Sequence, residues 1–338
     1  MQSRFAEPIG ALKLPANPEK AITVSDLRRV YHSSQGIFKK TRNVVEAVKG
    51  ISFDVDYGEL FGLVGPNGAG KTTTIKMLTT LLTPTSGTAR VLGFDIVKDV
   101  IAIRRGIGII FGGERGLYYR VSGRENLRYF ADLYGVPLSK RDKRIDELLE
   151  MVGLAERAEE RVEGYSRGMK QRLHIAKGLI NDPKLIFMDE PTIGLDPEAA
   201  RETRAMIKGQ VENGKTILLT THYMYEADEL CHRIGVISGG RIVALDSPSA
   251  LKRFVKDVTV IEVEAFGVAD ADLMALRQQP DVTAVNANLE GERQTIRVQT
   301  ARGSEFIATV TKLLSKAKIM DVRIKEPTLE DAYLKLVA

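Results

Sequence analysis

Nine consecutive residues, 65–73, form a motif whose residue types and spacing suit phosphate binding. In order they are Gly65, Pro66, Asn67, Gly68, Ala69, Gly70, Lys71, Thr72 and Thr73. This order matches G-x-x-x-x-G-K-[ST], a pattern that cradles nucleotide phosphates where a strand leads into a helix. Glycines let backbone N–H groups turn toward the phosphates, and the helix N-terminus adds a positive dipole end. Lys71 can reach the β and γ phosphates, and the Thr72 hydroxyl can hold Mg²⁺.

A second motif combines a short apolar run, residues 185–188, with two acidic residues, Asp189 and Glu190. We expect a buried strand whose carboxylates emerge at its C-terminal edge, where α/β sheets bind ligands. Asp189 suits Mg²⁺, directly or through water. Glu190 would then face the γ-phosphate and could orient or deprotonate the attacking water. The competing interpretation is an acidic strand end that caps the next helix.

The elements that must position these residues follow from hydrophobic periodicity. A short apolar strand, Leu60–Val64, leads into the phosphate motif, and a helical pattern begins at Lys71 and is expected to stop near Pro84. Strands and helices alternate again over residues 185–244. This alternation predicts an α/β core with a largely parallel sheet covered by helices.

Two flanking regions complete the predicted nucleotide-binding domain. Residues 21–60 are predicted to be β-rich, with a polar loop over 32–43. Residues 122–181 are predicted to be mostly helical, and Ser122 with Glu125 forms a capping box at the start of the first helix.

The C-terminal part changes composition near residues 246–249. Residues 258–338 then alternate as β-α-β-β-α-β with a last short helix, which is the order of a ferredoxin-like domain. The sequence therefore predicts a loose N-terminal tail over 1–20, a nucleotide-binding domain over 21–247 and a small α+β accessory domain over 255–338.

Composition excludes several classes of protein. The 338 residues are 43% hydrophobic and 28% charged, an ordinary globular mixture. No apolar run approaches the roughly 18 residues of a membrane-spanning helix, so we expect another chain to cross any membrane involved. A single cysteine, Cys231, excludes an intrachain disulfide and fits a reducing compartment.

The net charge of +5 is local to the N-terminus. Residues 1–50 contain nine Lys/Arg and four Asp/Glu, whereas the remainder contains 40 of each kind. This distribution differs from the broad basic face of a dedicated nucleic-acid binder. The basic excess fits a solvated surface, or attraction to an anionic membrane.

A third motif makes the resemblance specific. Residues 165–172 read Tyr-Ser-Arg-Gly-Met-Lys-Gln-Arg, and Ser166 lies 23 residues before Asp189. With the two motifs above, this segment resembles the ATP-binding subunit of an ABC transporter. Ser166 and Gly168 correspond to the serine and second glycine of that family's L-S-G-G-Q signature, although the segment departs from it at three positions. Such variants resemble the branch that exports drugs, antibiotics, lipids or sodium through a separate membrane subunit. The alternative is an N-cap serine followed by a packing glycine.

The resemblance assigns roles to three further residues. Asp196 matches the aspartate that links two sites across a dimer, although Asp before Pro197 is also a good helix N-cap. His222 follows a predicted strand and matches the switch histidine that contacts the γ-phosphate. Tyr31 matches the aromatic residue that stacks on adenine, but any tyrosine at a strand end would look the same.

One residue of the family pattern is missing. The family usually carries a glutamine near residues 110–114 that helps hold Mg²⁺ and senses the membrane subunit. Both candidate positions, Gly112 and Gly113, are glycine here, and Glu114 is the nearest polar group. Glu114 or a water could take that place. The stretch 115–126 resembles the segment that docks the membrane partner.

Taken together, the resemblance implies an ATP-hydrolysing subunit that uses Mg²⁺ and powers transport, in the export direction, by a transmembrane permease subunit. Lys71, Glu190 and His222 are its expected catalytic residues. Two copies, or one copy and a homologous partner, would sandwich two ATP molecules between residues 65–73 of one chain and Ser166 and Gly168 of the other. The expected location is cytoplasmic, on the inner face of the cell membrane, with no nucleic-acid partner. The alternative is a soluble ABC-type ATPase acting on ribosomes or nucleic acid.

Overall fold

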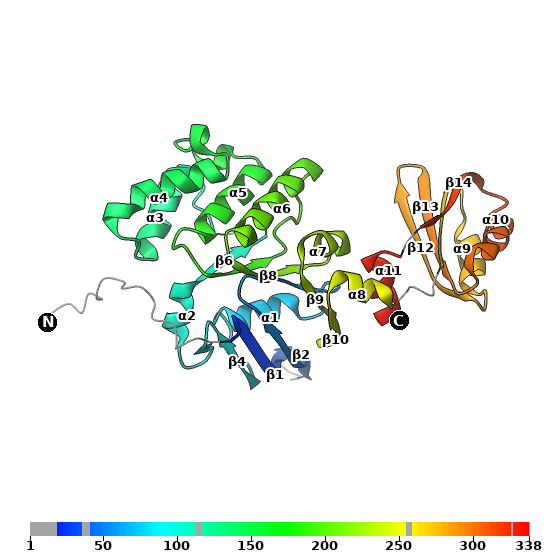
Figure 1. The fold of residues 1–338 in the computed structure, drawn as a ribbon, viewed down its shortest axis with the longest axis horizontal. Helices are drawn as coiled ribbons and strands as arrows, with labels where there is room; N and C mark the ends of the chain where they lie inside the picture. Colours follow the sequence, from blue (N-terminus) through cyan, green and yellow to red (C-terminus); the bar gives the residue numbers. More distant parts are fainter. Residues whose placement is uncertain (1–18, 36–40, 113–115, 255–258, 326, 338) are drawn as a thin grey trace. The chain divides into compact units, whose positions relative to one another are not determined.

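The computed structural model describes residues 19–35, 41–112, 116–254, 259–325 and 327–337. The chain divides into two compact units, Met1–Ile242 and Val243–Ala338, and Figure 1 labels the elements of both. The narrower domain limits given above remain predictions.

A six-stranded sheet, five of whose strands lie wholly within the first unit, has the strand order β10-β9-β3-β8-β7-β6. Its strands are β3 (Leu60–Val64), β6 (Ile107–Phe111), β7 (Leu185–Asp189), β8 (Thr216–Thr221), β9 (Arg233–Ser238) and β10 (Arg241–Asp246). The pairs β3–β8, β3–β9, β6–β7 and β7–β8 are all parallel. Every residue of β3, β7 and β8 is buried, as expected for strands covered on both faces. The predicted parallel core is confirmed.

The register of this sheet brings the ends of its strands to one edge. Asp189 lies opposite Thr220 on β8 and Phe111 on β6, and Val64 lies opposite Thr221. The phosphate motif and the acidic strand end therefore emerge at the same edge of the sheet.

A second sheet is antiparallel, with strand order β2-β1-β4-β5. Its strands are β1 (Ile22–Gln35), β2 (Thr41–Val55), β4 (Ser86–Val91) and β5 (Phe94–Asp95). The prediction of a polar loop over 32–43 is wrong for most of that segment. The β1–β2 pairing continues from Tyr31 opposite Val45 to Gln35 opposite Thr41. Ladder hydrogen bonds come from the backbone, so polar side chains do not end a strand that has a partner.

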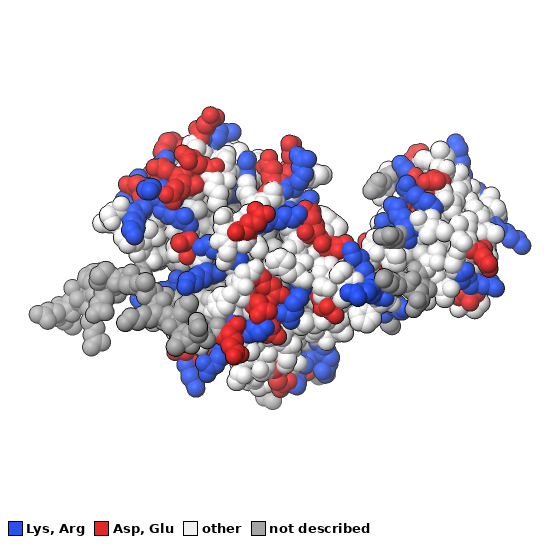
Figure 2. Space-filling view, viewed as in Figure 1, with Lys and Arg blue, Asp and Glu red and all other residues white. Residues whose placement is uncertain are grey.

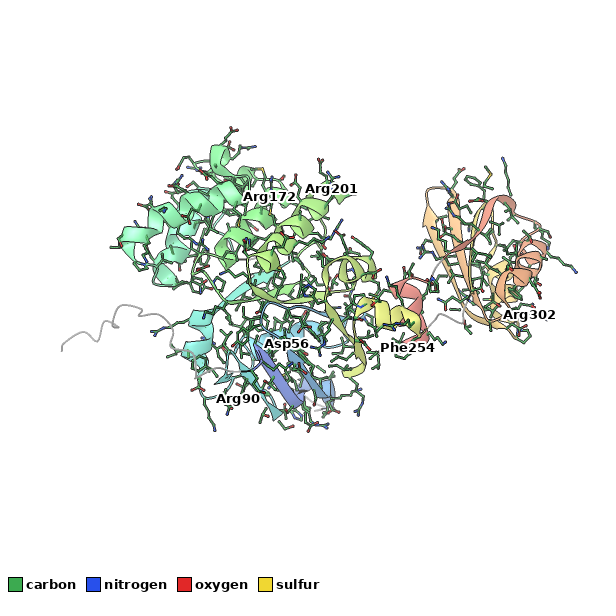
Figure 3. All side chains as sticks on the ribbon, in the orientation of Figure 1. Asp56, Arg90, Arg172, Arg201, Phe254 and Arg302 are labelled. Carbon is green, nitrogen blue, oxygen red and sulfur yellow. The ribbon has the colours of Figure 1, made fainter. Side chains whose placement is uncertain are left out.

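Seven α-helices are described in the first unit. They are α1 (Lys71–Leu78), α2 (Val100–Gly106), α3 (Gly123–Leu133), α4 (Leu138–Met151), α5 (Arg167–Gly178), α6 (Pro197–Glu212) and α7 (Met224–Leu230). Figure 1 shows α1 on one side of the parallel strands, and α5 and α6 on the other. Arg172 of α5, labelled in Figure 3, pairs with Glu202 of α6 at 3.6 Å. The capping box of Ser122 and Glu125 is confirmed at the start of α3.

The helix α1 ends earlier than its apolar pattern predicts. Thr80 adopts a left-handed backbone with φ of 62°. The amides of Leu81 and Leu82 then donate to the carbonyl of Lys76 at 2.8 and 2.9 Å. This turn satisfies carbonyls of the last helical turn well before Pro84, so the proline does not set the helix end.

The second unit is built on an antiparallel sheet with strand order β12-β13-β11-β14. Its elements are α8 (Pro248–Arg253), β11 (Thr259–Phe266), α9 (Asp270–Arg277), β12 (Val282–Glu290), β13 (Arg293–Thr300), α10 (Ile307–Leu313), β14 (Lys318–Lys325) and α11 (Leu329–Val337). The first strand pairs with both the third and the fourth, which is the ferredoxin-like arrangement and confirms the prediction. Ile261, Val263 and Ala265 of β11 belong to its apolar core.

The neighbouring positions of β11 face the opposite side of the sheet. Glu262 is only 2% exposed and accepts from Arg297 at 3.0 Å, Arg323 at 3.1 Å and Lys325 at 2.8 Å. Burial raises the pKa of Glu262, but these cations outweigh it and keep that pKa below its usual value. The buried carboxylate is therefore fully paired.

The visible surface of the first unit carries charges of both signs. On the face drawn in Figure 2, acidic and basic side chains alternate over the helices, and no broad basic area appears. Within the described residues, no helix has both the length and the apolar character needed to cross a membrane.

Candidate functional site

The phosphate motif folds into a tight loop between β3 and α1. Gly70 has a φ of +108°, and a Cβ atom there would lie 2.6 Å from the carbonyl oxygen of Ala47. Only glycine combines that backbone with that approach. Residues 66–68 are exposed, whereas Lys71 is 4% exposed. A cavity of about 140 Å³ lies here, lined by Ala47, Asn67, Gly68, Gly70, Lys71, Thr72, Thr73 and Glu190.

The ammonium group of Lys71 is held inside this loop. Its Nζ donates to the carbonyl oxygens of Gly65 at 2.7 Å and Pro66 at 3.2 Å. It also forms an ion pair with Oε1 of Glu190 at 3.2 Å. These three acceptors match the three N–H donors of the ammonium group, so an incoming phosphate oxygen would replace one of them.

Asp189 forms a cluster of oxygens with two threonines. Its Oδ1 accepts from the Thr72 hydroxyl at 3.2 Å and from the Thr220 hydroxyl. Mg²⁺ at nucleotide sites is commonly bound by one or two carboxylates, with phosphates completing the shell. One buried carboxylate beside one hydroxyl at the phosphate loop fits that requirement. The described residues contain no group of three or more His, Cys, Asp or Glu that could hold a metal without phosphate ligands.

Glu190 connects the other predicted catalytic residues. While Oε1 faces Lys71, Oε2 contacts Nδ1 of His222, which directly follows β8. The backbone of Glu190 is left-handed, with a φ of 53°. Such a conformation is costly for a residue with a side chain and is often found at functional sites. The structure thus brings Lys71, Glu190 and His222 together, although their catalytic roles remain to be tested.

Gly112 occupies one of the two positions where the family glutamine was sought. Its amide donates to the carbonyl of Asp189 at 2.7 Å. A Cβ atom at 112 would lie 2.1 Å from the carbonyl oxygen of Glu190, closer than any van der Waals contact. In this structure, the approach of Gly112 to Glu190 leaves no room for a glutamine. Gly113 and Glu114 lie outside the described residues.

Ser166 and Asp196 both cap helices. The Ser166 hydroxyl accepts from the amide of Met169 at 3.2 Å and begins α5. Asp196 accepts from the amide of Ala199 at 2.9 Å and begins α6, with Pro197 following it as predicted. Both caps are exposed, whereas Gly168 is buried with its ideal Cβ position 3.0 Å from Ala199. Among the described residues, no hydrogen bond joins Ser166 or Asp196 to the phosphate loop.

Tyr31 lies within β1, not at a strand end as the sequence suggested, because the hairpin continues beyond it. Its ring is 37% exposed and carries the guanidinium of Arg29 at 4.8 Å from its centroid. Stacking of Tyr31 on adenine remains a prediction.

Sequence reasoning missed three residues that the structure places around the site. Thr220 bonds the predicted metal ligand, and Thr192 bonds Glu226, which is fully buried. Two of these residues could have been found from their positions in the sequence. Thr220 lies two residues before His222, and Thr192 lies two residues after Glu190. Glu226 lies in a helical pattern where a glutamate is ordinarily a solvated residue, so its sequence context gave none.

Known proteins resemble this chain along most of its length. Residues 48–193 match the ABC transporter family. The chain is 37% identical over 303 residues to the linearmycin resistance ATP-binding protein LnrL of Bacillus subtilis (strain 168), covering 88% of this chain and 96% of that protein. It is 37% identical over 298 residues to the Nod factor export ATP-binding protein I of Paraburkholderia xenovorans (strain LB400), covering 88% and 94%. A solved dimer of the ATP-binding cassette MJ0796, in a post-hydrolysis state with ADP and Pi, superposes with a TM-score of 0.58 at 25% identity, covering 67% and 98%.

Proposed function

The chain belongs to the family of ABC transporter ATP-binding proteins, and from this premise we propose how its residues act. Proteins of this family hydrolyse ATP to drive transport, and this chain is such an ATPase. The alternative of an ATPase acting on ribosomes or nucleic acid is not supported, because transporter subunits match nearly the whole chain. The convergence of Lys71, Glu190 and His222 at the N-terminus of α1 carries the assignment of roles.

Residues 65–73 bind the phosphates of ATP through backbone amides and Lys71. Thr72 and Asp189 would hold Mg²⁺, which neutralises phosphate charge when bound. Glu190 accepts a proton from the attacking water as the water oxygen bonds to the γ-phosphorus and the bond to ADP breaks. His222 holds the second carboxylate oxygen of Glu190 and approaches the γ-phosphate.

Ser166 of a partner subunit, with its exposed helix cap, completes each ATP site across a two-fold dimer. A serine hydroxyl and the first backbone amides of α5 provide a second set of donors for phosphate. ATP bridges the two chains, and they separate after hydrolysis, once phosphate has left. The solved dimer of a related cassette supports this assembly.

The joining and separation of the two ATP-binding chains drives a transmembrane permease subunit. A cavity of about 480 Å³ at the ends of α2, α3 and α5 and along α4 offers a docking site that differs from the stretch 115–126 indicated by the family resemblance. Tyr134, Val136 and Ile180 give it apolar walls, while Lys140 and Arg144 line its charged side. Such a mixed groove suits an amphipathic helix from a partner's cytoplasmic loop. The names of the relatives, resistance and Nod factor export, favour export as the direction. The protein then lies on the cytoplasmic face of the membrane through its partner.

Replacement of Glu190 by Gln tests the central role. The amide keeps the size of the side chain but accepts no proton. We expect ATP turnover to fall by about a hundredfold or more, with ATP binding retained and a dimer trapped in size-exclusion chromatography with ATP and Mg²⁺. Turnover equal to the unaltered protein would contradict Glu190 as the general base.

A further inference from the structure

A buried hydrogen bond joins two residues that lie close in sequence to the candidate catalytic pair, Glu190 and His222. The Thr192 hydroxyl donates to Oε1 of Glu226 at 2.9 Å, and both side chains are buried, at 4% and 0% exposure. Thr192 follows Glu190 by two residues, and Glu226 follows His222 by four. Neither residue contacts the phosphate loop through a described hydrogen bond.

These positions close a ring of contacts. The carboxylate of Glu190 contacts His222, the first turn of α7 follows His222 and contains Glu226, and Glu226 accepts from Thr192, which is two residues from Glu190. The Tyr223 amide donates to the hydroxyl of Thr221 at 3.0 Å and fixes the start of that turn. The ring therefore joins the segment after β7 to the segment after β8.

The backbone of Glu190 needs such support. A left-handed, non-glycine residue persists only where its surroundings hold it. Its amide donates to the carbonyl of Thr220 at 3.0 Å, and its own carbonyl accepts from the amide of Ile193 at 3.2 Å. The buried hydrogen bond of the Thr192 side chain to Glu226 holds the turn over residues 190–193 from the side of the protein core.

Glu226 is an unusual choice for this buried place. Its second oxygen, Oε2, has no hydrogen-bond partner within the described part of the chain. Burial raises the pKa of Glu226 more than the hydroxyls of Thr221 and Thr192 and the charge of Arg204 lower it. A neutral carboxyl group can accept a hydrogen bond from Thr192 without the free-energy cost of burying an unpaired charge.

We propose that Glu226 and Thr192 are positioning residues for ATP hydrolysis, whose mutual hydrogen bond holds Glu190 and His222 in their reactive arrangement. This inference rests on the proposed role of Glu190. It assigns no proton transfer to Glu226 and no contact with nucleotide. Its signature is a loss in kcat with nucleotide binding unchanged, because the bond orients the base and not the phosphate loop.

The test compares variants that remove the bond with variants that keep it. Thr192→Val removes the hydroxyl at nearly constant volume, and Thr192→Ser keeps it. Glu226→Ala removes the acceptor, and Glu226→Gln keeps it. We expect Thr192→Val and Glu226→Ala to lower kcat by about tenfold with KM within about twofold, and the conservative pair to retain kcat within about twofold. The double variant should be no slower than the slower single variant.

A similar threonine–carboxylate hydrogen bond in the second unit serves as a control. It distinguishes a loss of catalytic positioning from a loss of folding stability. The Thr328 hydroxyl donates to Asp331 at 2.7 Å, and Asp331 is 1% exposed in the first turn of α11. Thr328→Val should lower the melting temperature without changing kcat. If Thr192→Val lowers only the melting temperature, as Thr328→Val does, or if the two losses in kcat are additive, the inference is overturned.

Two outcomes distinguish this inference from the proposed function. An active Glu190→Gln variant would remove the role of Glu190 itself. An inactive Glu190→Gln variant together with full kcat in Thr192→Val would overturn the positioning role alone. If Glu226→Ala does not fold, the comparison of Thr192→Val with Thr192→Ser still decides.

Discussion

The Nζ atom of Lys71 lies 3.2 Å from Oε1 of Glu190, so the phosphate-binding cation and the candidate base neutralise each other in this structure. Both side chains are largely buried, which weakens solvent screening of the pair. An incoming γ-phosphate competes with Glu190 for the same ammonium group. If Glu190 is the base proposed above, we expect nucleotide binding to release its carboxylate when the attacking water needs it.

This competition predicts that Glu190→Gln binds ATP at least as tightly as the unaltered protein. Removal of the carboxylate charge frees Lys71 for phosphate, and we expect affinity to rise by up to about tenfold. Titration with a fluorescent ATP analogue measures it, with Lys71→Met as the control that loses binding. A Glu190→Gln protein that binds ATP several-fold more weakly would show that the ion pair does not oppose the nucleotide.

The close approach of Gly112 to Glu190 predicts that no side chain is tolerated at 112. In Gly112→Ala, the new methyl group would meet the Glu190 carbonyl and move the left-handed backbone. We expect kcat to fall by more than about tenfold, and Gly112→Gln to be no better. Gly209→Ala in α6, where no atom lies within 4 Å of the added methyl, is the control and should keep kcat. Higher turnover in Gly112→Gln would instead show that the glutamine can be restored.

If the 480 Å³ cavity along α4 docks the permease subunit, a charged side chain added to its apolar wall should weaken binding of that subunit. Val136 is half-buried in its wall, and Val136→Glu places a carboxylate on the apolar side. We expect co-purification with the membrane subunit, after gentle detergent extraction, to fall by at least about tenfold with an unchanged melting temperature. Val97→Glu, at an exposed position outside this cavity, should retain the partner. Equal recovery with both variants would place the docking surface elsewhere.

Burial of His174 in α5 predicts sensitivity to acid. His174 is 1% exposed, neither ring nitrogen has a hydrogen-bond partner among the described residues, and burial, with Lys177 nearby, lowers its pKa to about 3. The unfolded chain binds this proton near pH 6.5, so folding stability is lost as pH falls from 6.5 toward 3. Between pH 6.5 and 4.5 the loss from this group is up to about 3 kcal/mol.

Urea unfolding at pH 7 and pH 4.5 measures this effect. His174→Leu should lose less stability over that interval than the unaltered protein, because leucine has no proton to bind. His232, whose Nδ1 accepts from the amide of Leu60 at 3.1 Å, offers a histidine with a partner for comparison. An identical pH dependence in the His174→Leu variant would contradict the assignment.

The phosphate loop, the acidic strand end and the ferredoxin-like order could be predicted because each depends on local sequence. Gly70 and Lys71 belong to one continuous motif, and β7 is a continuous apolar run that ends at Asp189. The β1–β2 hairpin was predicted less well, since its length depends on pairing between strands. Thr220, Thr192 and Glu226 meet only through the fold, so spacing along the chain did not reveal them.

The left-handed backbone of Glu190 implies a trade-off between stability and turnover. Glycine would adopt this conformation without the penalty of about 1 kcal/mol or more that a side chain incurs there. Selection for a thermostable protein would therefore favour changes at this position that discard its chemistry. If Glu190 is the base proposed above, no residue type at position 190 gives both ATP turnover and the least strained backbone.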